Sequence, residues 1–474
     1  MPASETNAFD YDTIIIGAGM SGLAAGIRLA MYDQRVCILE RHTTIGGLNS
    51  FYRLDGRNFD VGLHALTNYM PKGDRRHPLG RVLKQLRFSW DEFQLCEQLE
   101  SQVAYGDRRL AFSNDPQLLI SEVAERFPHQ ADAFVRLVDE LPGYDDLGEI
   151  PEGASGREFV SQYISDPLLA DMLLAPLFYY GSARENDVDA DQFVILFRSI
   201  YLEGFCRPRE GVRLILRLLT RKYKALGGEL RLRSGVNALN TKGDSVREIV
   251  LDSGEVLTAK RVVSSAGWRE TEALLSGETN NNGEAPTLDQ RPPGRLSFVE
   301  TLSVLDCPAA ELGHKPTIIF YNATDRIAWQ PPEELVDLRS GVICCPGNFA
   351  FDEPPDLSMI RVTCLANYER WKSLPREAYL AEKDVWFERV LEAIQPYTPP
   401  FREHIVARDM FTPTTIVKFT GHFNGAVYGA PNKQRDGRTP LSNLFICGTD
   451  QGFVGIIGTL VSGVSIANRY LLVD

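Results

Sequence analysis

The sequence predicts an α/β fold in which a domain built on a parallel sheet is interrupted by a mixed α+β domain. Residues 12–16 read as a buried strand that leads into a glycine-rich turn, a helix and a second strand, the pattern of a parallel sheet covered by helices. Two more apolar strands are expected far along the chain, one at 261–264 that runs into a glycine-containing turn and one at 444–450 that ends in an acid. The 474 residues are enough for several domains of roughly 100–200 residues each.

Composition argues against several classes of protein. Lys and Arg number 50 against 63 Asp and Glu, and the net charge of -13 shows no basic footprint for nucleic acid. The eight cysteines form no C-x-x-C pair and no zinc spacing, so we expect neither a disulfide framework nor a metal site. Residues 1–11 show no signal peptide, and the uncharged stretch 451–468 is shorter than the ~20 apolar residues of a membrane span. We therefore expect a cytoplasmic protein.

A G-x-G-x-x-G motif follows the first strand. Gly17 permits a tight turn, Gly19 lets the backbone approach a pyrophosphate, and Gly22 lets helix and strand pack closely. The helix N-terminus then stabilises phosphate charge, and Glu40, at the end of the second strand, can accept both ribose hydroxyls. A glycine turn that binds nothing would not need these parts in this order. We predict a dinucleotide site that includes Gly17, Gly19, Met20, Ser21, Gly22 and Glu40.

Past Glu40 the chain continues into R-H-T-T-I-G-G-L-N-S and then a turn-rich stretch that ends in F-D-V-G at 59–62. A simple NAD domain would enter its next crossover helix here. With its G-x-G-x-x-G, acid and Gly-Gly pair, the chain resembles the FAD-dependent amine oxidase and phytoene desaturase superfamily. The resemblance implies a Rossmann-like FAD-binding domain of the glutathione-reductase type. It also implies that the Gly-Gly turn lies near the FAD pyrophosphate and ribityl chain, with Arg41, Gly46, Gly47, Leu48 and Asn49 as binding residues.

Two later segments fit the same family. Residues 208–228 read as an amphipathic helix, three short strands are expected around 229–259, and an apolar strand runs into Ser265-Ala266-Gly267. The resemblance implies that Val236 meets the adenine through its backbone and that Ala266 and Gly267 border the cofactor. The last segment is a strand at 444–450 followed by a glycine-rich helix from Gly452 to Tyr470. By resemblance it holds the ribityl chain and the flavin N1 and O2 edge, through Gly448, Asp450, Gly455, Ile456 and Ile457.

These pieces divide the chain. The FAD-binding domain is expected at 1–68, 210–275 and 425–474, and a substrate domain at 69–209 and 276–424. Helical periodicity dominates the first insertion, whereas the second has a loop at 276–294, strand-like runs and a helix near 377–394. The segments 62–64, 412–429 and 448–451 also resemble the desaturase family, and 62–64 and 448–451 are more similar to carotenoid isomerases and retinol saturases than to phytoene desaturases proper.

A flavin adds or removes hydride at N5, so the protein chiefly positions a substrate carbon and excludes water. A hydrophobic isoprenoid polyene suits the chain's aromatic residues, because apolar tunnels recognise shape and area. Seven aromatic residues lie in two runs at near-helical spacing and are either ordinary core or a tunnel lining: Phe178, Tyr179, Tyr180, Phe193, Phe197, Tyr201 and Phe205.

Two polar residues are catalytic candidates. His64 follows the F-D-V-G element, which leads toward the flavin ring in relatives, and it could donate a proton, orient the flavin or be structural. Lys418 is a weaker candidate, because amine oxidases hold a water at N5 with a lysine.

Residues 72–87 read as a basic amphipathic helix in an acidic protein. Leu79, Val82, Leu83 and Leu86 form its apolar side, and the basic residues are Lys72, Arg75, Arg76, Arg81, Lys84 and Arg87. This pattern is typical of either a peripheral membrane contact or a solvated face.

Three functions are compatible with the sequence. The leading one is an FAD-dependent oxidoreductase that desaturates, saturates or isomerises a carotenoid- or retinoid-type polyene. The second is an amine oxidase of the same fold, and the third is a lipid-binding escort, like the Rab GDP-dissociation inhibitors, that has lost FAD. The intact glycine motif, Glu40 and the Gly448-Thr449-Asp450 ending argue against the escort. The expected ligand is a hydrophobic small molecule, and the electron acceptor and oligomeric state stay open.

Overall fold

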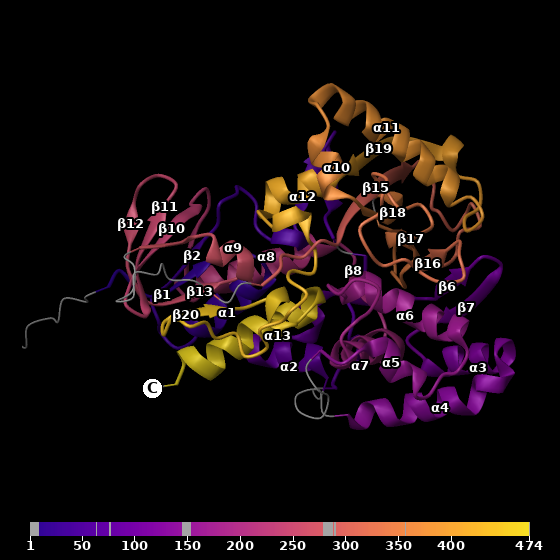
Figure 1. Cartoon of the computed structure of the whole chain (residues 1–474), viewed down its shortest axis with the longest axis horizontal. Coiled ribbons are helices and arrows are strands. Elements are labelled where there is room, and N and C mark those ends of the chain that lie inside the picture. The colour runs from indigo at the N-terminus through magenta and orange to yellow at the C-terminus, as the bar shows by residue number, and fades with distance from the viewer. Residues whose placement is uncertain are drawn as a thin grey trace, which may run out of the picture.

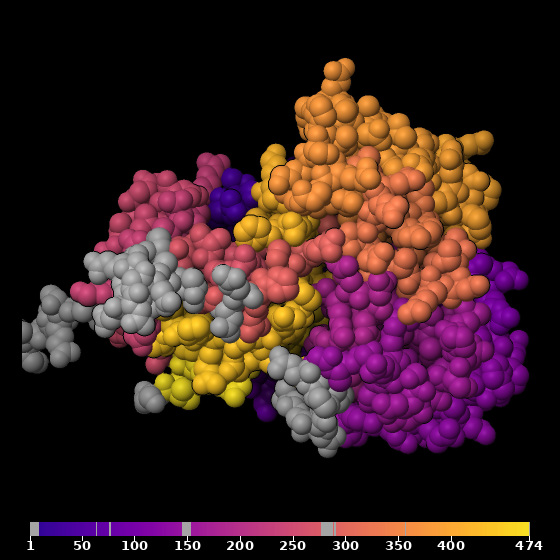
Figure 2. All heavy atoms as spheres, in the orientation of Figure 1, coloured from indigo at the N-terminus to yellow at the C-terminus, as the bar shows by residue number. Residues whose placement is uncertain are grey.

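The computed structural model describes residues 9–62, 64–74, 77–144, 153–277, 288, 291–355 and 357–473. The molecule has two halves, one around a parallel sheet and one around a larger mixed sheet (Figure 1). In the space-filling view the mixed-sheet half lies on the right, with orange segments above purple ones (Figure 2). The predicted α/β class is therefore confirmed.

The parallel sheet has five strands in the order β20-β13-β1-β2-β9, and all of its neighbours run parallel. Its strands are β1 (Tyr11–Ile16), β2 (Val36–Leu39), β9 (Glu229–Arg231), β13 (Ala259–Ser264) and β20 (Leu444–Ile446). They come from all three segments predicted for the FAD-binding domain. Segments that lie hundreds of residues apart in the sequence thus share one sheet.

Both faces of the parallel sheet are buried, which explains its unbroken apolar strands. Ile15 and Ile38 face helices α1 (Met20–Ala30), α8 (Val212–Ala225) and α13 (Gly455–Ile466). Ile14 and Leu39 face a small four-stranded sheet. That sheet consists of β10 (Val236–Lys242), β11 (Ser245–Leu251), β12 (Val256–Leu257) and β14 (Leu275–Gly277). Three strands are expected in residues 229–259, and the structure has four there. The first of them, β9, pairs with β2 in the parallel sheet and not with the small sheet.

The mixed sheet has seven strands in the order β19-β15-β18-β17-β16-β6-β7, antiparallel except for the β16–β6 pair. They are β6 (Ser101–Tyr105), β7 (Arg108–Phe112), β15 (Ser297–Leu305), β16 (Ile318–Asn322), β17 (Ser340–Cys344), β18 (Ser358–Ala366) and β19 (Ile405–Phe411). One face packs on α3 (Pro116–Arg126), α4 (Ala131–Glu140), α5 (Gly156–Ser161), α6 (Pro167–Gly181) and α7 (Ala190–Phe197). The other is covered by α10 (Tyr368–Ser373) and α11 (Arg376–Ala393).

Short elements join the two halves. They are the hairpin β3 (Phe51–Leu54) and β4 (Arg57–Asp60), the pair β5 (Leu95–Glu97) and β8 (Cys206–Pro208), and the helices α2 (Pro78–Leu86), α9 (Trp268–Glu272) and α12 (Pro413–Thr420). Within the described residues, no helix combines the length and apolarity that crossing a bilayer requires.

Helix α2 turns its apolar side inward. Leu79, Val82, Leu83 and Leu86 are buried in the core formed with α1, α8 and α13. This side therefore packs against protein, and a membrane contact through the basic side stays a prediction. Only the basic side, with Arg81 and Lys84 exposed, faces solvent. Arg75 and Arg76 lie outside the described residues.

Candidate functional site

A cavity of about 750 Å³ opens at the carboxyl ends of β1 and β2, where doubly wound sheets place their ligands. Its walls come from the glycine loop after β1, the turn after β2, the start of β10, the hairpin β3–β4 and helix α12. Eight of the residues predicted to bind the cofactor line it: Gly17, Gly19, Glu40, Arg41, Gly47, Leu48, Val236 and Ala266.

The glycine loop divides its roles as the motif predicts. Gly17 has a φ of +94°, which a side chain would strain. A Cβ on Gly22 would lie 2.2 Å from the carbonyl oxygen of Gly17, so only glycine lets α1 approach the loop. A Cβ on Gly19 would meet no described atom within 4 Å and would enter the cavity. Met20, Ser21 and Gly22 are buried in the first turn of α1 and do not line the cavity.

The first turn of α1 is open to a ligand. Its N-cap, Gly19, has a β-region backbone, and among the described residues no side chain caps the helix and no acid stands in its first turn. Uncapped N–H groups at a helix start, together with the positive end of the helix dipole, form an anion site. The arrangement can bind a phosphate without any cationic side chain.

Glu40 is held in place by backbone amides. Its Oε2 accepts a hydrogen bond from the N–H of Ala18 at 2.9 Å, and its Oε1 accepts one from the N–H of His42 at 2.9 Å. Each carboxylate oxygen keeps a further lone pair for a hydroxyl group in the cavity. The guanidinium of Arg41 lies against Gly421, where a Cβ would be 2.5 Å from its Nη1.

The Gly-Gly turn folds back onto the glycine loop. The N–H of Gly46 donates to the carbonyl of Ala18 at 2.9 Å, and Gly46 adopts a φ of +110° that glycine tolerates. Gly47 and Leu48 then face the cavity, whereas Gly46 and Asn49 do not line it. On the opposite wall, Val236 begins β10 and Ala266 follows β13. Gly267 lies behind Ala266, against Glu270 and Asp450.

The C-terminal residues lie outside this cavity. Asp450 is buried, and its two carboxylate oxygens accept the N–H groups of Trp268 at 2.5 Å and Ala430 at 2.7 Å. Gly448 packs over Ser21, so the loop before α13 sits directly on α1. Gly455 opens α13 with Ile456 and Ile457 buried, and no described side chain caps that helix. A role of these residues toward a cofactor stays a prediction.

Helix α12 forms a wall that motif reading missed. Thr415, Ile416 and Phe419 line the cavity, as do Asp409, Met410 and Phe411 at the end of β19. Below α12, His422 Nδ1 lies 3.3 Å from Glu270 Oε1. Burial alone would lower the pKa of His422, but Glu270 raises it. The resemblance noted at 412–429 pointed to this segment without indicating that it covers the cavity.

His64 belongs to a buried network of charges. Its Nε2 lies 3.0 Å from Glu300 Oε1 on β15 and 3.1 Å from Thr363 Oγ1 on β18. Arg361 Nε donates to the same Glu300 oxygen at 2.7 Å, and the side chains of Glu300 and Arg361 are almost fully buried. Arg207 donates to the carbonyl oxygen of His64 at 3.0 Å, which fixes its backbone as well.

The network sets the charge of its members. Burial alone would raise the pKa of Glu300, but the Arg361 charge and the His64 hydrogen bond lower it to about 2. Burial lowers the pKa of His64, although Glu300 opposes this. Glu300 is therefore ionised and His64 is neutral near pH 7. A neutral imidazole held by one nitrogen can exchange a proton through the other.

The remaining candidates, Lys418 and the two aromatic runs, lie outside the lining of the cavity. Lys418 is exposed on α12, with its Nζ over the Phe419 ring at 5.4 Å, and does not reach the cavity. The predicted aromatic runs are packed in the core beneath the mixed sheet, with Tyr180 stacked on Phe205 at 4.9 Å between ring centroids. Their packing matches the core alternative, and a tunnel lining stays a hypothesis.

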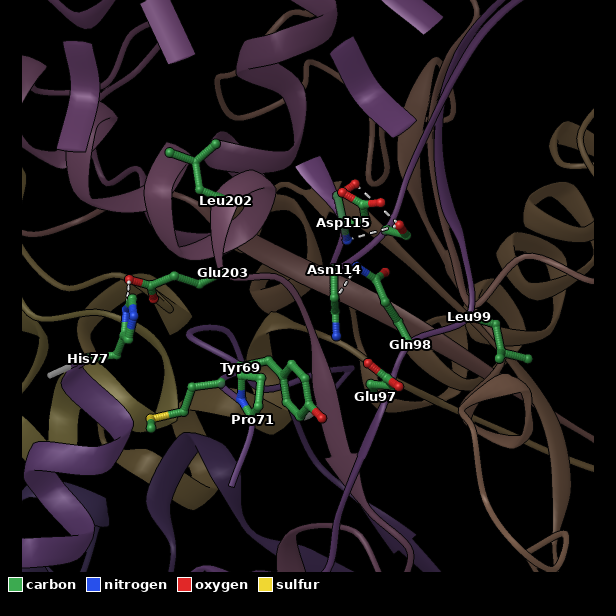
Figure 3. Close-up of a pocket in the computed structure, with 12 residues that line it drawn as sticks. Tyr69, Pro71, His77, Glu97, Gln98, Leu99, Asn114, Asp115, Leu202 and Glu203 are labelled. Carbon is green, nitrogen blue, oxygen red and sulfur yellow. Dashed lines mark hydrogen bonds and ion pairs between the residues drawn. The ribbon is translucent and has the colours of Figure 1, made fainter. Parts of the chain in front are cut away.

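A second hollow of about 510 Å³ lies beside α2 (Figure 3). His77 Nδ1 and Glu203 Oε1 are 3.0 Å apart at one side, and Gln98 donates to Asn114 Oδ1 at 2.9 Å at the other. None of the predicted cofactor residues is among its described lining. The larger cavity at the strand ends is thus the candidate site.

Comparisons of the sequence and of the structure with known proteins both find flavin-containing amine oxidoreductases or carotenoid- and retinoid-related enzymes. The sequence model for flavin-containing amine oxidoreductases matches residues 20–471. A chloroplastic prolycopene isomerase from an Oncidium hybrid cultivar is 22% identical, over 98% of this chain and 84% of its own. The all-trans-retinol 13,14-reductase of Danio rerio is 25% identical, over 98% and 87%. Putrescine oxidase bound to putrescine has a TM-score of 0.62 and 18% identity, over 97% of this chain and 99% of its own.

Proposed function

We propose a substrate for this chain, which belongs to the flavin-containing amine oxidoreductase family and is an FAD-dependent oxidoreductase. The proposed substrate is a hydrophobic isoprenoid polyene of carotenoid or retinoid type. The reaction would be desaturation, saturation or cis–trans isomerisation of a carbon–carbon double bond. Of the proteins named above, the two sequence relatives are a prolycopene isomerase and a retinol 13,14-reductase by name, which supports this range of reactions.

The residues of the large cavity fit FAD. The uncapped start of α1 and the open space beside Gly19 suit a pyrophosphate, and Glu40 offers oxygen atoms to a ribose. Val236 and Ala266 would border the adenosine part, and Gly47 and Leu48 the chain beyond the phosphates. When bound, FAD supplies hydride transfer at N5. The protein supplies binding, orientation and exclusion of water.

The pairing of the buried carboxylates supports the choice of a polyene over an amine. An ammonium group that enters a buried site needs an unpaired carboxylate or a comparable set of acceptors. In the described part of the chain, Asp60 pairs with Arg207, Glu300 with Arg361, and Asp450 with two backbone amides. Asp171, Asp191 and Asp337 each pair with an arginine. Glu40 accepts from two backbone amides, and its free lone pairs face the proposed ribose site. A polyene requires no such partner.

His64 would serve the same reaction as an acid or base. It is neutral, its Nε2 is fixed by Glu300 and Thr363, and it lies at the junction of the two halves of the molecule. Adding or moving a proton on a polyene carbon needs one positioned group of this kind. Glu300 and Arg361 would act as positioning residues, because they orient the ring.

The test begins with the purified protein and its released cofactor. We expect bound FAD, conversion of prolycopene or all-trans-retinol under anaerobic conditions with reduced flavin, and no hydrogen peroxide with putrescine. Peroxide formation with putrescine, together with no change in either polyene, would replace the proposal with the amine oxidase reading.

The His64→Gln variant tests the acid–base role. We expect the FAD content to be unchanged and the kcat on the polyene to fall by about 10²–10⁴-fold. The matched control is His129→Gln, because His129 also pairs with a carboxylate, at 3.1 Å from Asp166, but lies on the surface. Wild-type turnover in His64→Gln would assign His64 a structural role only.

A further inference from the structure

Three potential metal ligands meet at one end of the mixed sheet, in the region of β15 and β19 (Figure 1). Leu305, the last residue of β15, pairs with Ile405, the first residue of β19. The residues just beyond this pair, Asp306 and His404, are therefore neighbours, and the N–H of Asp306 donates to the carbonyl of His404 at 3.1 Å. Cys307 follows in the same turn.

The three side chains converge. His404 Nδ1 lies 2.9 Å from Asp306 Oδ1 and 3.6 Å from Cys307 Sγ, and all three ligand atoms lie within 4.8 Å of one another. Cys307 is a free thiol, and both it and His404 are partly exposed, so an ion could enter from solvent. The strand pairing brings together ligands about 100 residues apart, which no local cysteine spacing could indicate.

We propose that Asp306, Cys307 and His404 form a binding site for a borderline-soft divalent cation, with Zn²⁺ as the expected ion. The site is separate from the FAD cavity and does not depend on the proposed function. A nitrogen, a sulfur and a single carboxylate oxygen suit Zn²⁺, whereas Mg²⁺ and Ca²⁺ prefer oxygen ligands.

The geometry favours a metal site over a nucleophilic triad. In a Cys-His-Asp triad the two ring nitrogens of the histidine serve different partners, one the nucleophile and the other the acid. Here the same atom, His404 Nδ1, faces both Cys307 Sγ and Asp306 Oδ1. One shared nitrogen cannot relay a proton between the two, but three atoms around one point can coordinate an ion.

The separation of the sulfur and nitrogen ligand atoms fits tetrahedral zinc. Bonds of about 2.0–2.3 Å at tetrahedral angles place ligand atoms roughly 3.4–3.7 Å apart. The sulfur–nitrogen distance of 3.6 Å already meets this value. The nitrogen–oxygen distance of 2.9 Å is that of a hydrogen bond and needs to widen by roughly 0.5 Å when the ion replaces the proton. A water molecule would take the fourth position.

The bound ion would fasten the turn after β15 to the start of β19. The other end of β19, Asp409 to Phe411, lines the FAD cavity. The ion would thus steady a strand that reaches the cavity wall without touching the cofactor itself.

The experiment uses the tag-free, FAD-loaded full chain with a phosphine reductant, titrated with Co²⁺ and then Zn²⁺. We expect one Co²⁺ per chain, a thiolate-to-cobalt charge-transfer band, and displacement of Co²⁺ by Zn²⁺ but not by Mg²⁺. Cys307→Ser and His404→Gln should each abolish the band. They should also weaken Zn²⁺ binding by more than about 100-fold, since even outer partners of ligands contribute about 10- to 100-fold.

Two control variants make the result specific. Cys96→Ser removes another partly exposed free thiol, and His129→Gln removes a surface histidine that pairs with an aspartate but has no cysteine in its pair. Both should bind metal as the wild type does. Absence of the band in the wild type would overturn the proposal, and so would a band that survives Cys307→Ser. The two ligand variants alter different segments, the turn after β15 and the short helical turn before β19, so a folding defect in one leaves the other informative.

Discussion

The two halves of the molecule prepare their sites in different ways. Around the parallel sheet the site is built mainly from backbone groups. Glycines let the backbone approach a ligand closely, helix α1 starts without a side-chain cap, and two backbone amides hold Glu40. At the mixed sheet it resides in buried side chains from distant strands, in particular His64, Glu300 and Arg361. The position of the backbone groups at the parallel sheet depends on local sequence. The position of the charged side chains at the mixed sheet depends on how distant strands pair.

The largest expected loss of stability comes from breaking the buried ion pair between Glu300 and Arg361. Arg361→Met leaves Glu300 buried with an uncompensated charge, and we expect it to lower the free energy of unfolding by about 3–5 kcal/mol. The double variant Glu300→Leu, Arg361→Met removes both charges and should cost clearly less than the single one. Chemical denaturation of both proteins measures the difference, and equal losses would show that the pair is not coupled.

Acid should weaken the same network. The pKa of Glu300 is depressed to about 2 from an ordinary value of 4.5. A depressed pKa means that the stabilisation is complete above pH 4.5 and is lost as the pH falls toward 2, by about 3 kcal/mol in all. Denaturant unfolding between pH 5 and pH 2.5 tests this. The Glu300→Gln variant should show a smaller slope over the same interval, and an identical slope would assign the acid loss to other carboxylates.

Two glycines test the backbone design at a smaller scale. Gly22→Ala forces a Cβ to 2.2 Å from a backbone oxygen, so it should lower the free energy of unfolding by about 1–3 kcal/mol. The same variant should also bind FAD more weakly. Gly19→Ala meets no described atom, so the apoprotein should keep its stability. Its FAD affinity should nevertheless fall by about tenfold or more, since the methyl group enters the cavity. Thermal unfolding and FAD titration separate the two outcomes, and equal stability losses would contradict the assignment.

The smallest effect is expected on the exposed side of α2. Arg81→Glu with Lys84→Glu should change the free energy of unfolding by less than about 0.5 kcal/mol, because neither charge is buried. Leu83→Ala on the buried side should cost about 2–5 kcal/mol. Flotation of the double variant with anionic vesicles also tests the membrane contact expected from sequence, since a contact through the basic side would be lost.

Sequence reasoning grouped residues correctly where their positions depend on local spacing. The glycine loop, Glu40 and the Gly-Gly turn are close in the chain, and the structure brings them to one cavity. It could not place His64 beside Glu300, because that contact depends on the register of a strand more than 200 residues away. It also left α2 open between a membrane contact and a solvated face, since an amphipathic pattern does not indicate whether lipid or protein covers its apolar side.

The strand order of the parallel sheet has a consequence for the synthesis of the chain. Because β20 is the neighbour of β13, the sheet cannot close until residues 444–446 have left the ribosome. At about 5–20 residues per second, roughly 9–36 s separate the emergence of β13 from that of β20. During this interval the β13 edge lacks its partner, and unpaired edges of this kind invite aggregation. Recovery of intact protein should therefore depend on how quickly translation finishes and on chaperones that shield the nascent sheet.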